Sequence, residues 1–305
     1  MDKKFSSSKG FGEILDYTFH LTKNRFKDFF MIFLILMGPV YLLQAIIQLF
    51  SGTSFFREVG SGNTWFEGVL SSFKESGTFD PNGFGIDLGL ILVGLVSVIL
   101  GPVAEAAILF ATDHVRRDEE YTVGSVIKQA FSRFWPMIWS SLLFGLITFG
   151  IILIPIVIIG VTGGAVGTMV NPIAGILLGI LLFLGFAVGV GLLLTRWSFY
   201  FGSVVLDRES PGLGRSWRLT HKRTWALVGL YIIFYLIISS ISFGVQMTFG
   251  LFLGNSVLLS IISNIATLFT TMLFSVGYAV MYLDLKNRHD ADDLKEMIDD
   301  YNDVN

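Results

Sequence analysis

Two ionisable residues lie well inside apolar stretches of the sequence and are the first candidates for chemistry. The acids Asp113 and Asp207 end these two stretches. If each stretch is a helix that rises 1.5 Å per residue, Glu105 lies about 12 Å from Asp113 and Arg196 about 17 Å from Asp207. A charge at membrane depth is costly and by default suggests function. A structural ion pair that holds the two helices together is the reading we favour over a transport site.

A second candidate is a row of polar side chains near the end of the chain. Six of them recur at offsets of 0, 4, 7, 11, 15 and 18 residues, so one face of a helix carries Ser260, Asn264, Thr267, Thr271, Ser275 and Tyr278. Such a face could line a polar cavity inside the membrane. Hydrogen bonds between packed helices are the alternative, and we favour that interpretation.

The signatures of common enzyme sites are missing from the sequence. It has no G-x-x-x-x-G-K-[ST], H-E-x-x-H or G-x-S-x-G motif. No two of the four histidines have the i,i+4 spacing of a helical metal site; they are His20, His114, His221 and His289. We therefore expect no catalytic residues, no metal and no cofactor, and predict that the protein is not an enzyme.

The elements that carry these residues are long apolar segments. The chain is 53% hydrophobic and only 15% charged over 305 residues, with a mean hydropathy of +0.69. Blocks of about 20 or more apolar residues can cross a bilayer as helices. The sequence predicts an all-α polytopic membrane protein with six transmembrane helices, at about residues 29–50, 88–112, 137–160, 173–206, 226–251 and 257–283. The fourth block is too long for one upright span and predicts a long or bent helix.

A repeated unit organises these segments. Arg25, Arg133 and Arg223 each precede an odd-numbered span, while Asp113, Asp207 and Asp284 each close an even-numbered one. We predict three hairpins, each preceded by a cytoplasmic amphipathic helix in the membrane interface. Residues 1–28 form the first such lead, a glycine-rich loop precedes Asn171-Pro172, and residues 284–305 form an acidic cytoplasmic tail.

One stretch also resembles a known family. The matching positions are Arg196, Trp197, Asp207, Ser216, Trp217, Arg218, Leu219, Thr220 and Trp225, together with GEILD at 12–16 and YLDLKNRHDADDL at 282–294. They resemble the glycerophosphoryl diester phosphodiesterase membrane domain, in which Glu usually stands where this chain has Asp207. The resemblance implies a stand-alone membrane module, because the His-Arg-Gly motif of the soluble phosphodiesterase domain is missing.

Basic residues are unevenly distributed between the two sides of the predicted spans. Six Lys and Arg precede the first span, and four, five and three occupy the other loops and the tail on that side. The opposite loops hold two, none and none. This asymmetry places both termini in the cytoplasm of a bacterial-type cell. Within the third basic loop, Arg215, Arg218 and Lys222 form a stripe that could bind anionic lipid or an acidic partner, or could only set the topology.

These observations predict a non-catalytic membrane module, a scaffold or accessory subunit at the cytoplasmic membrane. The alternative is a carrier or binding protein for a lipid or small amphiphile that uses a polar intramembrane cavity. We expect membrane lipids and proteins at the cytoplasmic face as partners, and no nucleic acid.

The absence of cysteine makes the predicted topology directly testable by single-cysteine labelling. Ser71→Cys should react with a membrane-impermeant thiol reagent added outside the cell, and Ser210→Cys should react only after the membrane is opened. The reverse pattern would invert the topology.

Overall fold

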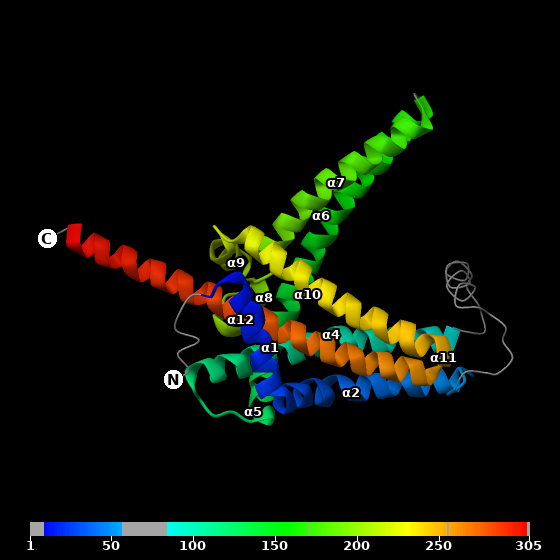
Figure 1. Cartoon of the computed structure of the whole chain (residues 1–305), viewed down its shortest axis with the longest axis horizontal. Coiled ribbons are helices and arrows are strands. Elements are labelled where there is room, and N and C mark those ends of the chain that lie inside the picture. The colour runs from blue at the N-terminus through cyan, green and yellow to red at the C-terminus, as the bar shows by residue number, and fades with distance from the viewer. Residues whose placement is uncertain (1–8, 57–83, 170, 255, 304–305) are drawn as a thin grey trace. The chain divides into compact units, whose positions relative to one another are not determined.

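The structure is a computed structural model that describes residues 9–56, 84–169, 171–254 and 256–303. Ser71, the outer labelling position, lies outside these ranges. The described residues are predominantly helical and contain no strand. Figure 1 shows the helices along the chain, from α1 (Phe11–Asn24) to α12 (Val257–Asp303).

Six stretches of helix in the described residues are long and apolar enough to cross a membrane. They are Phe26–Phe50, Gly89–Arg117, Phe134–Met169, Pro172–Leu206, Thr224–Gly250 and Val257–Asp290. Each coincides with one of the six predicted spans. The prediction of an all-α, multi-pass membrane protein is therefore confirmed at this level.

The chain divides into two compact units, which we describe separately. Unit 1 contains residues 1–14, 132–232 and 279–305, and unit 2 contains residues 15–131 and 233–278. Helices α1, α10 (Thr224–Val245) and α12 each contribute residues to both units.

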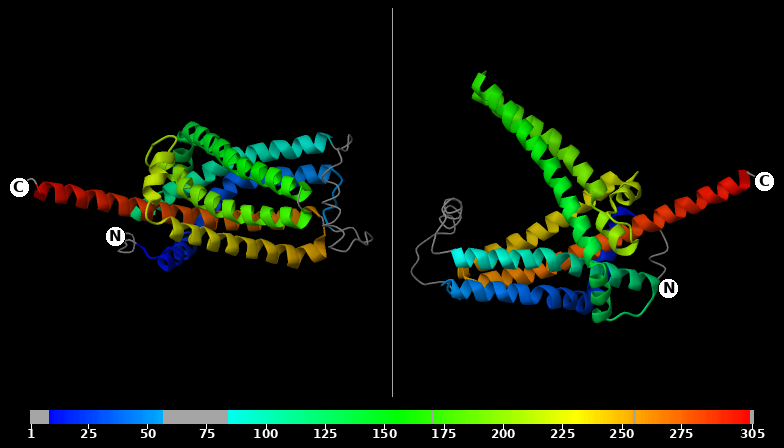
Figure 2. Two further views of the ribbon diagram at one scale, coloured as in Figure 1. Left: turned by 90° about the horizontal axis from the view of Figure 1, so that it is seen from above. Right: turned by 180° about the vertical axis from the view of Figure 1, so that it is seen from behind.

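Unit 1 contains two long helices that lie side by side, α6 (Phe134–Met169) and α7 (Pro172–Trp197), as both Figures 1 and 2 show. Their backbones approach closely at glycines. A methyl group added at Gly175 would lie 2.5 Å from the Gly163 carbonyl oxygen and 2.7 Å from the Gly167 backbone. Small residues at this spacing allow helices to pack without intervening side chains.

The fourth apolar block, for which the sequence predicts a long or bent helix, is interrupted near its end. Helix α7 ends at Trp197, and a separate helix, α8 (Tyr200–Leu206), begins after Ser198 and Phe199. Tyr200 anchors α8 on α6, because its ring stacks on Phe144 at 4.4 Å and its hydroxyl donates to Ser141 at 3.1 Å. Gly212, in the left-handed region at φ 74°, leads into α9 (Leu213–Thr220).

Unit 2 is built on α2 (Phe26–Phe50) and α4 (Phe84–Arg117), which lie side by side in Figures 1 and 2. Buried side chains from both helices include Phe29, Ile32, Phe33, Val103, Ala107 and Ile108. The Phe234 ring of α10 fits over Gly277 of α12, where an added methyl group would lie 2.4 Å from the ring. The unit also contains most of α5 (Val123–Ser132), η1 (Gln246–Gly250) and α11 (Leu251–Leu253).

Two helices extend further than the sequence predicts. Helix α6 continues to Met169 through the segment predicted as a glycine-rich loop, because its glycines pack directly on α7. Helix α12 continues from the sixth span to Asp303, through most of the predicted acidic tail. Residues 284–303 contain no glycine or proline, so nothing interrupts the helical hydrogen bonds.

The glycine contact between α6 and α7 predicts a position-specific effect of a single methyl group. Gly175→Ala should force the helices apart and destabilise the protein by about 1–3 kcal/mol, as overpacking does elsewhere. Gly185→Ala on the same helix is the matched control, because no atom lies within 4 Å of its added methyl group. Thermal unfolding in detergent would measure both, and equal midpoints for the two variants would contradict the close packing.

Candidate functional site

The break between α7 and α8 is closed by a serine from α9. A helix end leaves backbone donors and acceptors without partners inside the helix. The buried Ser216 hydroxyl donates to the Arg196 carbonyl at 2.7 Å and accepts from the Phe199 N–H at 3.1 Å. Ser216 therefore links both sides of the break.

Arg196 and Trp217 pack on each other beside this serine. The guanidinium carbon of Arg196 lies 4.0 Å from the centre of a Trp217 ring, and the Trp197 ring is 6.0 Å from that of Trp217. Stacking of a guanidinium on an indole is a favourable cation–π contact. Thr220 adds hydrogen bonds to the carbonyls of Ser216 and Arg196, at 2.9 and 3.3 Å. Five positions of the family resemblance thus lie around one helix break: Arg196, Trp197, Ser216, Trp217 and Thr220.

Asp207, which ends α8, is the centre of a second polar cluster. Its carboxylate accepts from the Tyr282 hydroxyl at 2.6 Å and from the Lys286 ammonium, both on α12. It also pairs with Arg215 of α9. The Asp207 side chain is only 6% exposed, so three segments of unit 1 converge on one buried acid.

The cluster keeps Asp207 ionised. Burial alone would raise its pKa, but hydrogen bonds from Lys286 and Tyr282 and the charges of Lys286 and Arg215 outweigh burial and hold the pKa below its usual value. The ring of Tyr282 is fully buried against Gly202, where a methyl group would lie 2.5 Å from the ring. Tyr282 is thereby fixed in position to donate.

Asp284 forms a third cluster, around the start of the described chain. Its carboxylate accepts from the Lys9 backbone N–H and from Arg288, each at 2.8 Å. Arg288 also donates to the Lys9 carbonyl at 2.7 Å. A second cation, Arg223, is held more loosely, at 3.9 Å from Asp284 and 3.4 Å from the Lys9 carbonyl.

The corresponding acid of unit 2 has the same kind of environment. Asp113, near the end of α4, pairs with Arg116 at 2.9 Å and with Arg117 at 2.8 Å. Each of the three acids predicted to close an even-numbered span is therefore largely buried and paired with two cations.

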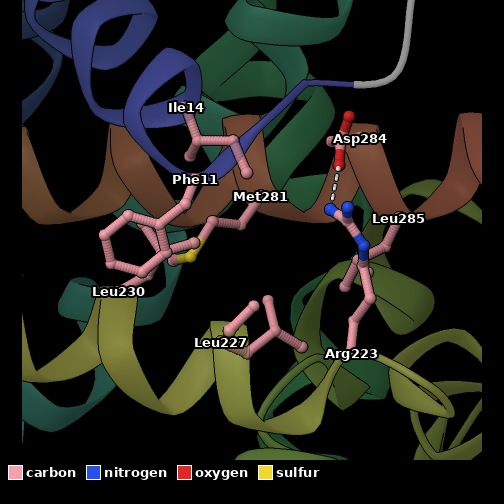
Figure 3. A pocket seen from close by; sticks show the side chains of 9 residues that line it. Phe11, Ile14, Arg223, Leu227, Leu230, Met281, Asp284 and Leu285 are labelled. Carbon is pink, nitrogen blue, oxygen red and sulfur yellow. Dashed lines mark ion pairs between the residues drawn. The ribbon is translucent and has the colours of Figure 1, made fainter.

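A small cavity of about 80 Å³ in unit 1 borders the Asp284 cluster. It is lined by Phe11 and Ile14 of α1, by Arg223, Ala226, Leu227 and Leu230 at the start of α10, and by Met281, Asp284 and Leu285 of α12. Figure 3 shows apolar side chains on one side of the space and the Arg223–Asp284 ion pair on the other. The cavity thus combines an apolar lining with a charged rim.

The predicted basic stripe is divided by the structure. Arg215 is bound to Asp207 and Glu209 and is only 19% exposed. Arg218 and Lys222 are exposed, but α9 ends at Thr220 and Lys222 lies beyond it at φ 74°. Arg215 and Arg218 lie on α9, whereas Lys222 lies beyond its end, so the three residues are not on one helix. A role of the stripe in binding anionic lipid or a partner stays a prediction.

The other predicted site residues, on the polar face of α12 and in the Glu105–Arg196 pair, stay candidates. On the polar face of α12, Asn264 donates to Gln44 of α2 at 3.3 Å and Thr267 bonds the Ser263 carbonyl at 2.9 Å. Ser275 is buried, its hydroxyl without a hydrogen-bond partner in the part of the chain that the structure describes. The Glu105–Arg196 ion pair stays a prediction, because the two residues belong to different units.

The sequence reading missed the partners of the two acids in unit 1. Tyr282 and Lys286 face Asp207, and Lys9 and Arg288 face Asp284. A signal was present, since Tyr282, Lys286 and Arg288 all fall in the segment that carries the family resemblance at the chain's end. Arg288 follows Asp284 by four residues, the spacing of a helical ion pair, whereas no local spacing links Tyr282 or Lys286 to Asp207.

Comparisons with known proteins find no match to this chain: no protein-family model, no curated protein and no solved structure matches it.

The Asp207 cluster predicts a large effect from a nearly isosteric change. Asp207→Asn leaves Lys286 without its counterion and Arg215 with only the exposed Glu209, and should lower stability by about 3 kcal/mol, the cost of breaking a buried pair. Glu209→Gln, on an exposed side chain that also faces Arg215 at 3.5 Å, should change stability by less than about 0.5 kcal/mol. Chemical unfolding of both variants in detergent would measure the difference.

The same pair of proteins tests the ionisation of Asp207. Because its folded pKa is lowered, its contribution is complete above the ordinary Asp value of about 3.9 and is lost as pH falls through the folded pKa. The stability gap between wild type and Asp207→Asn should stay constant from pH 7 to pH 5 and close at lower pH. A gap that widened on acidification would show that the folded pKa is raised instead.

Proposed function

We propose that the protein is a non-catalytic integral membrane module, a scaffold or accessory subunit of a bacterial-type cytoplasmic membrane. The observation that supports this most is the state of its buried acids. Asp113, Asp207 and Asp284 each hold two cations, and Asp207 and Asp284 join segments that are far apart in the sequence. Groups engaged in this way give a rigid surface on which partners can assemble.

The proposed architecture is three helical hairpins, each preceded by an amphipathic helix at the cytoplasmic interface. Short helices α1, α5 and α9 do precede α2, α6 and α10 along the chain. Each buries some apolar side chains and exposes a charge: Ile14 with Asp16, Val126 with Lys128, and Leu219 with Arg218. In this proposal both termini and the basic loops face the cytoplasm.

The family resemblance supports the same proposal. Several of the residues that carry it, Arg196, Ser216, Trp217 and Thr220 among them, lie around the α7–α8 break, and Asp207 holds α9 and α12 at the end of α8. A stand-alone member of the glycerophosphoryl diester phosphodiesterase membrane domain family would then keep these residues for architecture. The alternative role, a carrier with a polar intramembrane cavity, stays a prediction. The contacts of Asn264 and Thr267 are of the kind that packed helices make.

Site-specific photo-crosslinking in cells would test the scaffold role. A crosslinker at Arg218 or Lys222, both exposed, should give discrete adducts with a partner protein. The control position is Leu181 in α7, an apolar side chain that is 70% exposed, and it should give none.

The carrier alternative predicts a different result. Positions 218 and 222 would give no protein adduct, and purified protein would move labelled lipid between vesicles. Asn264→Leu and Thr267→Val would slow that transfer. This combination would contradict the scaffold role.

A further inference from the structure

We propose that the cavity between α1, α10 and α12 in unit 1 binds an anionic amphiphile. Its alkyl chain would occupy the apolar lining, and its phosphate or carboxylate would bind Arg223. The site does not depend on the proposed scaffold role.

The lining of the cavity suits an alkyl chain. Leu227 and Leu230 of α10 and Met281 of α12 are buried and line the space together with Phe11 (Figure 3). A methyl group at Gly229 would lie 3.1 Å from the Phe11 ring, so this glycine lets the ring lie close to α10. With a water molecule occupying about 30 Å³ of liquid, the volume of about 80 Å³ admits a short stretch of chain.

Arg223 is the group that can bind the headgroup. Asp284 already accepts hydrogen bonds from Arg288 and from the Lys9 N–H, each at 2.8 Å. Arg223 lies 3.9 Å from the Asp284 carboxylate, and its side chain is 37% exposed. Arg223 can therefore turn toward an incoming anion without leaving Asp284 unpaired. A guanidinium donates two parallel hydrogen bonds to a phosphate or carboxylate.

The order of residues along α10 matches the shape of such a ligand. Arg223 directly precedes the membrane span that begins at Thr224, which is the depth of lipid headgroups. Leu227 and Leu230 follow about 6 and 10 Å further along the helix, at 1.5 Å per residue. An anion bound at Arg223 would thus direct its chain along the apolar wall.

Native mass spectrometry of the purified full-length protein tests the site. The probes are dioleoyl phosphatidylglycerol, dioleoyl phosphatidylcholine, oleate and inorganic phosphate. We expect one tightly bound phosphatidylglycerol or oleate per chain, and weaker binding of phosphatidylcholine. Phosphatidylglycerol binding without oleate binding would assign the headgroup to a phospholipid, and the opposite result would assign it to a fatty acid.

Two variants target the two halves of the site. Arg223→Gln should weaken binding about fivefold, as expected for one basic residue beside an anionic lipid, and Arg223→Lys should restore most of it. Ala226→Leu fills the cavity from its wall and should weaken binding of the chain-bearing probes. Its matched control is Val228→Leu, at a position on the same helix that is not part of the lining, and Lys128→Gln, on an exposed side chain of α5, controls for loss of a surface charge.

Several outcomes would overturn the proposal. The proposal is wrong if Arg223→Gln and Ala226→Leu both bind the probes as tightly as the wild type. It is also wrong if phosphatidylcholine and phosphatidylglycerol bind equally tightly. Inorganic phosphate that bound as tightly as phosphatidylglycerol would show that the cavity contributes nothing. Circular dichroism and gel filtration of each variant ensure that loss of binding is not loss of fold.

Discussion

The structure of unit 1 depends on the neutralisation of one buried carboxylate. Asp207 ends α8 with a side chain that is 6% exposed, and a charge in such a place is costly unless it is paired. Arg215, Tyr282 and Lys286 provide the pairing. Because these partners come from α9 and α12, the requirement fixes where the loop after α8 returns and which face of α12 turns inward.

At Asp284 the same arrangement, a buried acid paired with cations, leaves one cation, Arg223, partly free. Like Asp207, it is buried, with two basic side chains and one neutral donor around it, here the Lys9 backbone N–H in place of the Tyr282 hydroxyl. Only Arg288 and the Lys9 N–H lie at hydrogen-bonding distance, so the Arg223 guanidinium, at 3.9 Å, remains at the rim of an apolar cavity. The looser cation gives the Asp284 cluster a binding surface that the Asp207 cluster does not have. The difference arises from the chain that packs on it, because both acids occupy equivalent places in the predicted repeat.

The sequence by itself determined the properties that depend on neighbouring residues. Length and hydropathy predicted the six spanning helices, because crossing a bilayer requires about 20 apolar residues in succession. Asn171-Pro172 predicted the start of α7, where the Asn171 side chain accepts from the Ile173 N–H at 2.8 Å. The excess length of residues 173–206 predicted a long or bent helix, and in the structure this block is divided into α7 and α8. The acids Asp113, Asp207 and Asp284 were also recognisable from their positions at the ends of spans.

Only the tertiary structure decided which residues the acids meet outside their own stretch of helix. Asp207 and Lys286 are 79 residues apart, and Lys9 and Asp284 are 275 apart, so no local spacing encodes either contact. The same limit applies to Arg215, which the sequence grouped with Arg218 and Lys222 as surface charge. It applies to the glycines of 160–169, which favour a loop by propensity yet form a helix against Gly175. In each case the energy comes from a partner distant in the chain, and packing against that partner outweighs the local preference.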